Sequence, residues 1–310
     1  MSALPERVLR LGRRPLARPR LSVLTPFRGD DPTPLLERLA DAPEGVEFIL
    51  LDDGTNRAAL LARVIKAAEA MNAPATVIVR AHNCGRAAAR NRLLAEAQGE
   101  YVLFLDADML PDNPNFLRIW FSLIECERPF VAFGGLSLAQ AKPTRETALH
   151  HNIFGHSDCR SAHERQRDAA QFTASANLLV RRDFLNDIKF DPEFAGWGWE
   201  DVDWALRAAQ HAKIVHVDNP ATHVGLDCVD TLMRKSKEAG PNFARLARKH
   251  PDAMPRFMSH RVARALKRLP LRAAWRGLCA WLVRRDHAPL PLRSMAFKVY
   301  RASYYAEYLP

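Results

Sequence analysis

The sequence predicts an α/β protein built on a mostly parallel central sheet flanked by helices. Four short runs of apolar and β-branched residues, typical of buried strands, occur at 21–26, 47–53, 75–81 and 100–106. Stretches with the apolar spacing of helices separate these runs. Strands that alternate with helices in this way lie parallel in one sheet, with the helices packed on its faces.

The elements follow one another in a regular order. The predicted strands are LSVLTP, EFILLDD, ATVIVRA and EYVLFLD. The helical stretches between them are, in order, PLLERLADA, AALLARVIKAAEAM and GRAAARNRLLAEAQG. Downstream, ANLLV and AKIVHV are strand-like, and GWGWEDVDWALRAAQ opens a helix with apolar residues at Val202, Ala205 and Leu206. His216 lies inside AKIVHV, which predicts a core position for its side chain.

Composition indicates an ordinary globular protein. The 310 residues are 48% hydrophobic and 26% charged, and no apolar run approaches the length of a membrane span or of a signal-peptide core. A cytoplasmic location is therefore favoured. The five cysteines are scattered and show no C-x-x-C spacing, so we expect reduced thiols rather than disulfides or a thiolate zinc site.

The positive charge lies at the two ends of the chain. Residues 1–20 carry six arginines and one acid, and residues 227–310 carry eighteen Lys and Arg and six acids, which leaves residues 21–226 net acidic at an overall charge of +10. We therefore expect a basic N-terminal segment (1–20), a catalytic α/β domain (21–226) and a basic, mainly helical extension (227–310). A basic surface attracts nucleic acid, anionic lipid or phosphorylated molecules, and charge alone does not choose among them.

The extension contains an amphipathic stretch whose role the sequence leaves open. Leu271, Ala274, Trp275, Leu278 and Leu282 share one helical face, and arginines flank it. Such a helix can lie on the surface of an anionic membrane. The protein would then be a peripheral protein at the inner face of that membrane. The alternative is a helix that packs its apolar face on the rest of the protein and leaves its basic face in solvent.

Polar residues gather where the predicted strands end, at LTPFRGD, LDDGT, RAHNCGR and LDAD. In parallel sheets ligands bind beyond the carboxyl ends of the strands, although the acids of LDDGT could equally be turn formers. Asp106 and Asp108 would point to the same side of an extended chain, because side chains there repeat with period two. Two carboxylates held together call for a cation.

Six motifs in order carry a family resemblance over residues 20–226. LTPFRGD, LDDGT, NCGRAAARN, LDAD, GWGWEDVDW and ATHVG together resemble the motifs of family 2-type glycosyltransferases with the GT-A fold. GWGWEDVDW is similar to the W-G-G-E-D segment of chondroitin-polymerase-like and β1,4-galactosyltransferase-like enzymes. This chain departs from that pattern at Trp199, where the family often has glycine, and we expect a tighter acceptor pocket as a result.

The resemblance implies a set of donor and metal residues. The nucleotide-sugar residues it implies are Thr25, Pro26, Arg28, Asp53, Asn83, Arg90, Asp106, Ala107, Trp197 and Gly198. The helix that starts near Gly85 would offer free backbone N–H groups to the diphosphate. Asp106 and Asp108 would form the D-x-D motif that holds Mn²⁺ or Mg²⁺ on this diphosphate, with His223 as the third metal ligand.

The resemblance also implies the reaction. Asp201 would be the general base that takes the proton of the acceptor hydroxyl, Glu200 would help to hold the acceptor, and the sugar would be transferred with inversion. We expect a UDP-sugar donor, with Gal, GalNAc or GlcNAc as the transferred group, and a glycan, glycolipid or other hydroxyl acceptor.

Two other classes of protein stay as alternatives. A nucleotidyltransferase that acts on a sugar phosphate would also use paired acids and a metal, but LTPFRGD lacks the lysine of a glycine-rich triphosphate loop. A basic nucleic-acid-binding module would explain Trp275, Trp281 and Tyr300 among the arginines of the extension, yet no nucleic-acid-binding fold signature accompanies them, so nucleic acid is disfavoured as a partner.

Overall fold

The computed structural model describes residues 6–14 and 16–309 and divides the chain into two compact units. Unit 1 comprises residues 1–141, 158–192 and 204–225, and unit 2 comprises residues 142–157, 193–203 and 226–310. Residues 1–5 and 15 of the predicted basic N-terminal segment lie outside the described residues.

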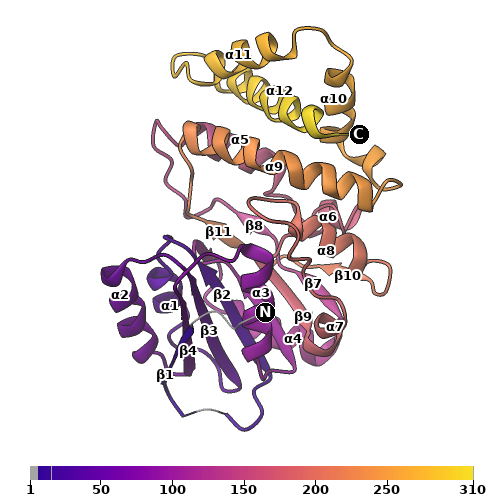
Figure 1. Ribbon diagram of the computed structural model, residues 1–310. Coiled ribbons are helices and arrows are strands. Elements are labelled where there is room, and N and C mark those ends of the chain that lie inside the picture. Colours follow the sequence, from indigo (N-terminus) through magenta and orange to yellow (C-terminus); the bar gives the residue numbers. More distant parts are fainter. Residues whose placement is uncertain (1–5, 15, 310) are drawn as a thin grey trace. The chain divides into compact units, whose positions relative to one another are not determined.

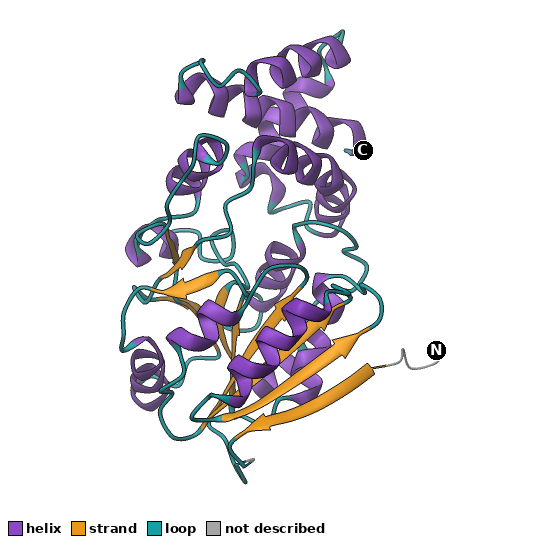
Figure 2. Cartoon of the chain, turned by 90° about the vertical axis from the view of Figure 1, so that its left-hand side faces the viewer, coloured by secondary structure: helices purple, strands orange, loops and turns teal. Residues whose placement is uncertain are grey.

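Unit 1 contains an eight-stranded sheet flanked by helices (Figures 1 and 2). In spatial order its strands are β1 (Glu6–Gly12), β4 (Pro74–Arg80), β3 (Val46–Asp53), β2 (Leu21–Phe27), β5 (Tyr101–Leu105), β9 (Asn177–Arg181), β7 (Val131–Phe133) and β10 (Ile214–His216). The block from β4 to β5 is parallel throughout, and β1 and β9 are antiparallel to their neighbours. The predicted mostly parallel α/β sheet is confirmed.

Among the described residues of unit 1, three helices lie close to the helical stretches predicted between the strands, at 34–42, 58–71 and 85–99, and the other three were not predicted. In order, the helices are α1 (Thr33–Arg38), α2 (Ala58–Glu69), α3 (Arg86–Glu96), α4 (Phe116–Cys126), α6 (Ala162–Gln166) and α7 (Arg182–Asp187). Successive turns of α2 bury Leu60, Val64 and Ala68, as the apolar spacing predicts. His216 is 7% exposed, which confirms its predicted place in the core.

A second sheet of three strands also belongs to unit 1 and brings distant parts of the chain together. It is formed by β6 (Met109–Pro111), β11 (Ala221–His223) and β8 (Leu136–Ser137) in that order. The antiparallel pairing of β6 with β11 sets His223 opposite Met109. The end of the LDAD motif and the ATHVG motif therefore meet here.

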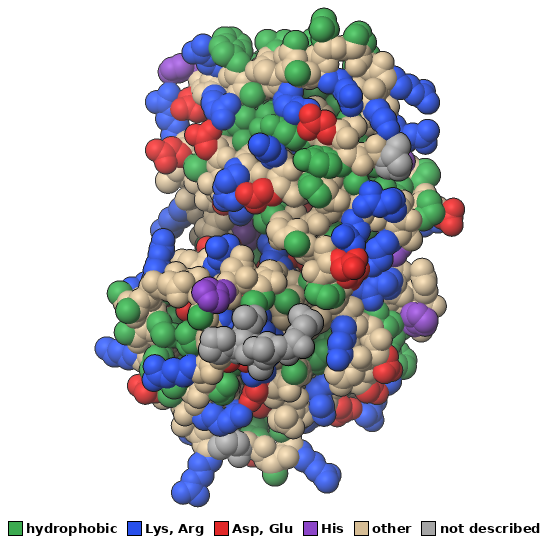
Figure 3. Space-filling model, in the orientation of Figure 1, with side chains coloured by type: hydrophobic (Ala, Val, Ile, Leu, Met, Phe, Trp, Pro, Cys, Tyr) green, Lys and Arg blue, Asp and Glu red, His purple; other side chains and the backbone are tan. Residues whose placement is uncertain are grey.

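Unit 2 is helical. Its elements are α5 (Ala148–Ser157), α9 (Val229–Lys249), the 3₁₀ turn η1 (Met254–Arg256), α10 (Met258–Lys267), α11 (Arg272–Val283) and α12 (Leu290–Tyr308), and the boundary between the units falls within α8 (Glu200–Ala208). Leu149, Met233, Val283 and Phe297 lie in one buried apolar cluster. Figure 3 shows Lys and Arg side chains among hydrophobic ones on the surface of these helices.

The structure also bears on the predicted state of the cysteines and on membrane-spanning helices. All five cysteines are free thiols, as predicted. None of the helices in residues 6–14 and 16–309 combines the length and hydrophobicity that a membrane span requires.

Candidate active site

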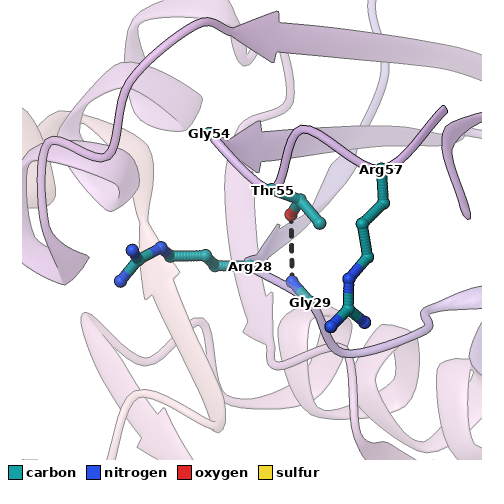
Figure 4. Close-up of a pocket in the computed structure, with 5 residues that line it drawn as sticks. All are labelled: Arg28, Gly29, Gly54, Thr55 and Arg57. Atoms are coloured by element: carbon teal, nitrogen blue, oxygen red, sulfur yellow. Dashed lines mark hydrogen bonds between the residues drawn. The ribbon is translucent and has the colours of Figure 1, made fainter.

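A shallow pocket of about 200 Å³ lies where β2 and β3 end (Figure 4). It is lined by Arg28, Gly29, Gly54, Thr55 and Arg57, and the two arginines extend on either side of a hydrogen bond of 2.9 Å that the Gly29 amide donates to Thr55 Oγ1. Two guanidinium groups beside an open pocket favour an anionic ligand.

Of the predicted nucleotide-sugar residues Thr25, Pro26 and Arg28, only Arg28 reaches this pocket. Arg28 lines it, whereas Thr25 is buried inside β2 and Pro26 is half-buried in the same strand. Arg57 was not predicted, since no motif contains it. Its place as the second basic residue of the pocket follows from the sharp turn after β3, where Gly54 and Asn56 both have positive φ.

Asp53 holds the loop before α3 in place. Its carboxylate is buried and accepts hydrogen bonds from the amides of Cys84 (3.1 Å) and Gly85 (3.0 Å), with Arg80 3.5 Å away. Asn83 Oδ1 accepts a second bond from the Gly85 amide at 2.9 Å. The Gly85 amide is therefore engaged by Asp53 at the end of β3 and by Asn83 of the loop, so it is not among the free N–H groups expected at this helix start.

The close approach of this loop to the turn after β3 requires glycine at position 54. A Cβ there would lie 2.6 Å from the backbone of His82 and of Asn83, and φ is +77°. The LDDGT and NCGR motifs, 31 residues apart at Asp53 and Cys84, therefore pack backbone against backbone.

Asp106 and Asp108 do not alternate as a strand would make them. β5 ends at Leu105, and the two aspartates lie in the turn that follows, so the expected period-two arrangement is wrong. Asp106 Oδ1 accepts a hydrogen bond of 3.0 Å from Arg90, a side chain that is only 1% exposed, and Arg86 lies 3.5 Å from Asp106 Oδ2. Asp106 is thus paired with arginine.

Asp108 instead meets His223. Asp108 Oδ2 lies 3.0 Å from His223 Nε2, because β6 and β11 pair directly after the LDAD turn. Burial alone would raise the pKa of the Asp108 carboxyl, but the hydrogen bond and charge of His223, with the charge of Arg86, lower it below 3.8. The Asp108 carboxylate is therefore held in its ionised form.

Gly225 allows this contact. A Cβ at that position would lie 2.1 Å from Asp108 Oδ2, so any other residue would push the carboxylate out of place. The amide of Val224 also donates to the Asp108 carbonyl at 2.9 Å. The glycine of the ATHVG motif is explained by its contact with an aspartate more than a hundred residues earlier.

The Asp108–His223 pair fits a divalent ion. A carboxylate oxygen and an imidazole nitrogen 3.0 Å apart are ligands that Mn²⁺ accepts. His223 ends the short strand β11, and Asp108 lies in the turn directly before β6, with which β11 pairs. Within residues 6–14 and 16–309, no three His, Cys, Asp or Glu side chains gather as a metal-binding group. Asp106 is thus not close enough to complete the predicted trio.

The GWGWEDVDW segment belongs to unit 2 up to Asp203 and is held there by α9. Asn242 Nδ2 donates hydrogen bonds of 2.9 Å to the carbonyls of Ala195 and Gly198. Asp203 is completely buried, with Lys249 Nζ at 2.8 Å and His250 Nε2 at 2.9 Å. Asp203 is thus an ion-pair partner of Lys249 within unit 2.

Trp199 adopts the left-handed conformation for which glycine is suited, with φ at +74°. Its ring lies against Phe243 (4.9 Å between centroids), Tyr305 (5.7 Å) and Phe257 (6.3 Å), all from the C-terminal part of unit 2. This aromatic packing accounts for a tryptophan where the related W-G-G-E-D segment has glycine. Glu200, which is buried, and Asp201 follow directly as the first turn of α8.

Trp197 is separate from this aromatic packing. Lys235 Nζ lies 5.8 Å from the centroid of its ring and 2.6 Å from Asp227 Oδ2. Trp197 and Trp199 therefore have different surroundings within unit 2.

Comparison with solved structures shows the fold. The chain is similar to S. aureus TarS, residues 1–349 (19% identity, 91% of this chain and 89% of that chain, TM-score 0.51), and to the mannosyltransferase PcManGT from Pyrobaculum calidifontis (17%, 96% and 89%, TM-score 0.59). It is also similar to glucosyl-3-phosphoglycerate synthase from Mycobacterium tuberculosis (18%, 74% and 79%, TM-score 0.51). No curated protein sequence matches the chain at a significant level.

A family match accompanies the shared fold. The sequence profile described as glycosyl transferase family 2 matches residues 32–189, about half of the 310-residue chain, and these residues include Asp53, Arg90, Asp106 and Asp108. The chain therefore belongs to glycosyl transferase family 2, and it is a glycosyltransferase with the GT-A fold.

Proposed function

We propose that this protein transfers a sugar from a UDP-sugar to an acceptor hydroxyl with the help of a divalent ion held by Asp108 and His223. The contact between these two side chains carries the proposal, since it joins an acid in the turn after β5 to an imidazole at the end of β11. Gal, GalNAc or GlcNAc is the expected group, in the synthesis of a glycan or glycoconjugate.

The solved relatives support a nucleotide-sugar donor and Mn²⁺. TarS was crystallised in complex with UDP-GlcNAc, PcManGT with GDP-Man and Mn²⁺, and the glucosyl-3-phosphoglycerate synthase with Mn²⁺ and UDP. The pocket lined by Arg28 and Arg57 suits the anionic part of such a donor. Because β2, β3 and β5 are neighbouring parallel strands, their carboxyl ends share the sheet edge at which a donor would bind.

The mechanism assigns one task to each side chain. Asp201 takes the proton of the acceptor hydroxyl as its oxygen forms a bond to the anomeric carbon, and the bond from that carbon to the diphosphate breaks, which inverts the configuration. Glu200 holds the acceptor. A divalent ion bound by Asp108 and His223 would neutralise the charge on the departing UDP. Arg90 fixes Asp106, whose place beside two arginines suits it to orient the donor rather than to ligate the ion.

We propose further that the enzyme works as a peripheral protein at the inner face of an anionic membrane. The support is the excess of Lys and Arg in residues 227–310.

Nucleotide release from a panel of UDP- and GDP-sugars tests the proposed reaction. The full chain is incubated with each donor and Mn²⁺, and we expect release with a UDP-sugar that EDTA abolishes and added Mn²⁺ restores. Asp108→Asn should lose Mn²⁺-dependent release. Asp187→Asn, which changes an exposed acid at the end of α7, is the matched control and should keep it. Release that is indifferent to EDTA would refute the role of the metal, and no release with any donor would refute the transfer.

A further inference from the structure

Helix α11 of unit 2 exposes large apolar side chains. Leu271, just before the helix, is 77% exposed, and Trp275, Leu278 and Trp281 are each 53% exposed. Spacings of three and four residues place these four side chains along one side of the helix. We call this set the α11 face.

The opposite side of α11 is packed on α12 and includes a charged residue. Arg276 donates a hydrogen bond of 3.0 Å from Nε to Ser303 Oγ and pairs with Glu307 at 2.9 Å, while Val283 is completely buried. An ordinary amphipathic surface helix buries its apolar side and exposes its charges. In α11 most of the predicted apolar face, Leu271, Ala274, Trp275 and Leu278, is exposed to solvent, and Leu282 alone of that set packs on the buried cluster of unit 2.

The part of the chain that contains α11 is strongly basic in sequence, although Arg276, Arg284 and Arg293 are paired with Glu307, Asp230 and Asp286. From Arg256 to Arg301 the chain has twelve Lys and Arg and a single acid, Asp286. The guanidinium of Arg285 lies 4.5 Å from the centroid of the Trp281 ring. A second copy of the chain would bring like charges together at this face, which disfavours self-association.

We infer that the α11 face docks on the surface of an anionic phospholipid bilayer. Tryptophan is the residue that best suits the boundary between headgroups and acyl chains, because its ring is apolar and its N–H is polar. Arginines around an apolar face bind anionic headgroups while the apolar side chains enter the interface. The inference rests on the proposed peripheral location and is independent of the proposed chemistry.

Co-sedimentation with vesicles tests the α11 face. The full chain should sediment with phosphatidylcholine vesicles that contain phosphatidylglycerol, should bind pure phosphatidylcholine much less, and should be released at about 1 M salt, where the Debye length is about 3 Å. The double variant Trp275→Ala, Trp281→Ala should bind anionic vesicles roughly tenfold more weakly or worse. Both side chains are more than half exposed, so the variant should fold, which circular dichroism checks.

A matched control variant changes another exposed aromatic ring, in unit 1. Phe130 is 41% exposed and lies under the guanidinium of Arg181, at 3.8 Å from its ring centroid, so Phe130→Ala also removes an exposed aromatic ring that stacks on an arginine. It should bind vesicles as the unaltered chain does.

The remaining outcomes of the vesicle experiment each support or overturn the inference. Equal vesicle binding by the double variant and the unaltered chain would overturn the inference, as would equal binding to neutral and anionic vesicles. A dimer in vesicle-free solution that the double variant abolishes would assign the face to a second copy, and tight binding of a single-stranded oligonucleotide that the same variant abolishes would assign it to nucleic acid. Vesicle binding without any nucleotide release would leave the inference standing and refute the proposed reaction.

Discussion

His216 should make the stability of unit 1 depend on pH between about 6.5 and 4. Its ring is 7% exposed, Arg165 Nε donates to Nδ1 at 3.1 Å, and Nε2 lies 3.1 Å from the carbonyl of Ala169. Both ring nitrogens are therefore satisfied in the neutral form. Burial, together with the charge of Arg165, lowers the pKa of His216 from 6.5 to about 4.

The sign and size of this effect on the free energy of unfolding follow from proton linkage. The unfolded chain takes up a proton at this residue below about pH 6.5, whereas the folded protein resists until about pH 4, so acid favours unfolding. The contribution is complete above pH 6.5 and is lost as the pH falls toward 4. At about 1.4 kcal/mol for each pH unit it amounts to roughly 3 kcal/mol, of which about 2 kcal/mol is lost by pH 5.

Urea unfolding at about pH 7.5 and about pH 5 measures this loss, with the fluorescence of the buried Trp120 and Trp204 as the signal of unit 1. In His216→Gln the titrating group is gone, so the difference in unfolding free energy between the two pH values should shrink by about 2 kcal/mol. His163→Gln, which changes an exposed histidine, should keep the difference found in the unaltered chain.

Paired carboxylates do not obscure the comparison. Burial tends to raise the pKa of Glu6, Asp31 and Glu96, but hydrogen bonds from arginine to Glu6 and Glu96, and from Thr33 and Arg63 to Asp31, lower it overall. The stability that these carboxylates contribute is therefore lost at lower pH, and it is the same in the variant and in the unaltered chain. If His216→Gln loses as much stability on acidification as the unaltered chain, the reasoning about this buried ring is refuted.

Three further outcomes test the proposed site and its support. Asp201→Asn should lower turnover by about 10² to 10⁴ while calorimetric UDP-sugar affinity barely changes, and turnover like that of the unaltered chain would remove Asp201 from the mechanism. His223→Ala and Asp108→Ala should each weaken Mn²⁺-dependent UDP binding in calorimetry, and full binding in both would show that the ion is held elsewhere. Trp199→Gly should relieve about 1 kcal/mol of left-handed backbone strain but lose the packing of a half-buried ring, for a net loss of roughly 2 kcal/mol in thermal unfolding.

The sequence predicted the parallel part of the sheet well, because buried strands leave an unmistakable pattern. The run EFILLDD became β3, whose residues are nearly all buried. By contrast β1 was missed inside the basic N-terminal segment. It is an edge strand with no fully buried residue, and tertiary ion pairs from Glu6 to Arg80 (2.8 Å) and Arg92 (2.7 Å) help to hold it, which a local pattern does not reveal.

The candidate site was predicted as a list of residues but not as a geometry. Asp108 and His223 do meet, yet the pairing of β6 with β11 that joins them involves strands of three residues, too short to show a periodicity. Asp106 was assigned to the metal by the D-x-D resemblance and by an extended LDAD, whereas it lies in the turn after Leu105 and accepts a hydrogen bond from Arg90. Partners so distant in the chain are set by tertiary structure.

The support of the GWGWEDVDW segment by α9 and α12 bears on truncation and on directed evolution. The contacts that hold this turn come from Asn242, Phe243 and Tyr305, all beyond the residues 32–189 that the family profile matches. A chain cut at residue 226 would keep the strands of the sheet and the Asp108–His223 pair but would lose every one of these contacts. Libraries that vary the C-terminal helices should therefore alter turnover and acceptor preference before they alter donor affinity.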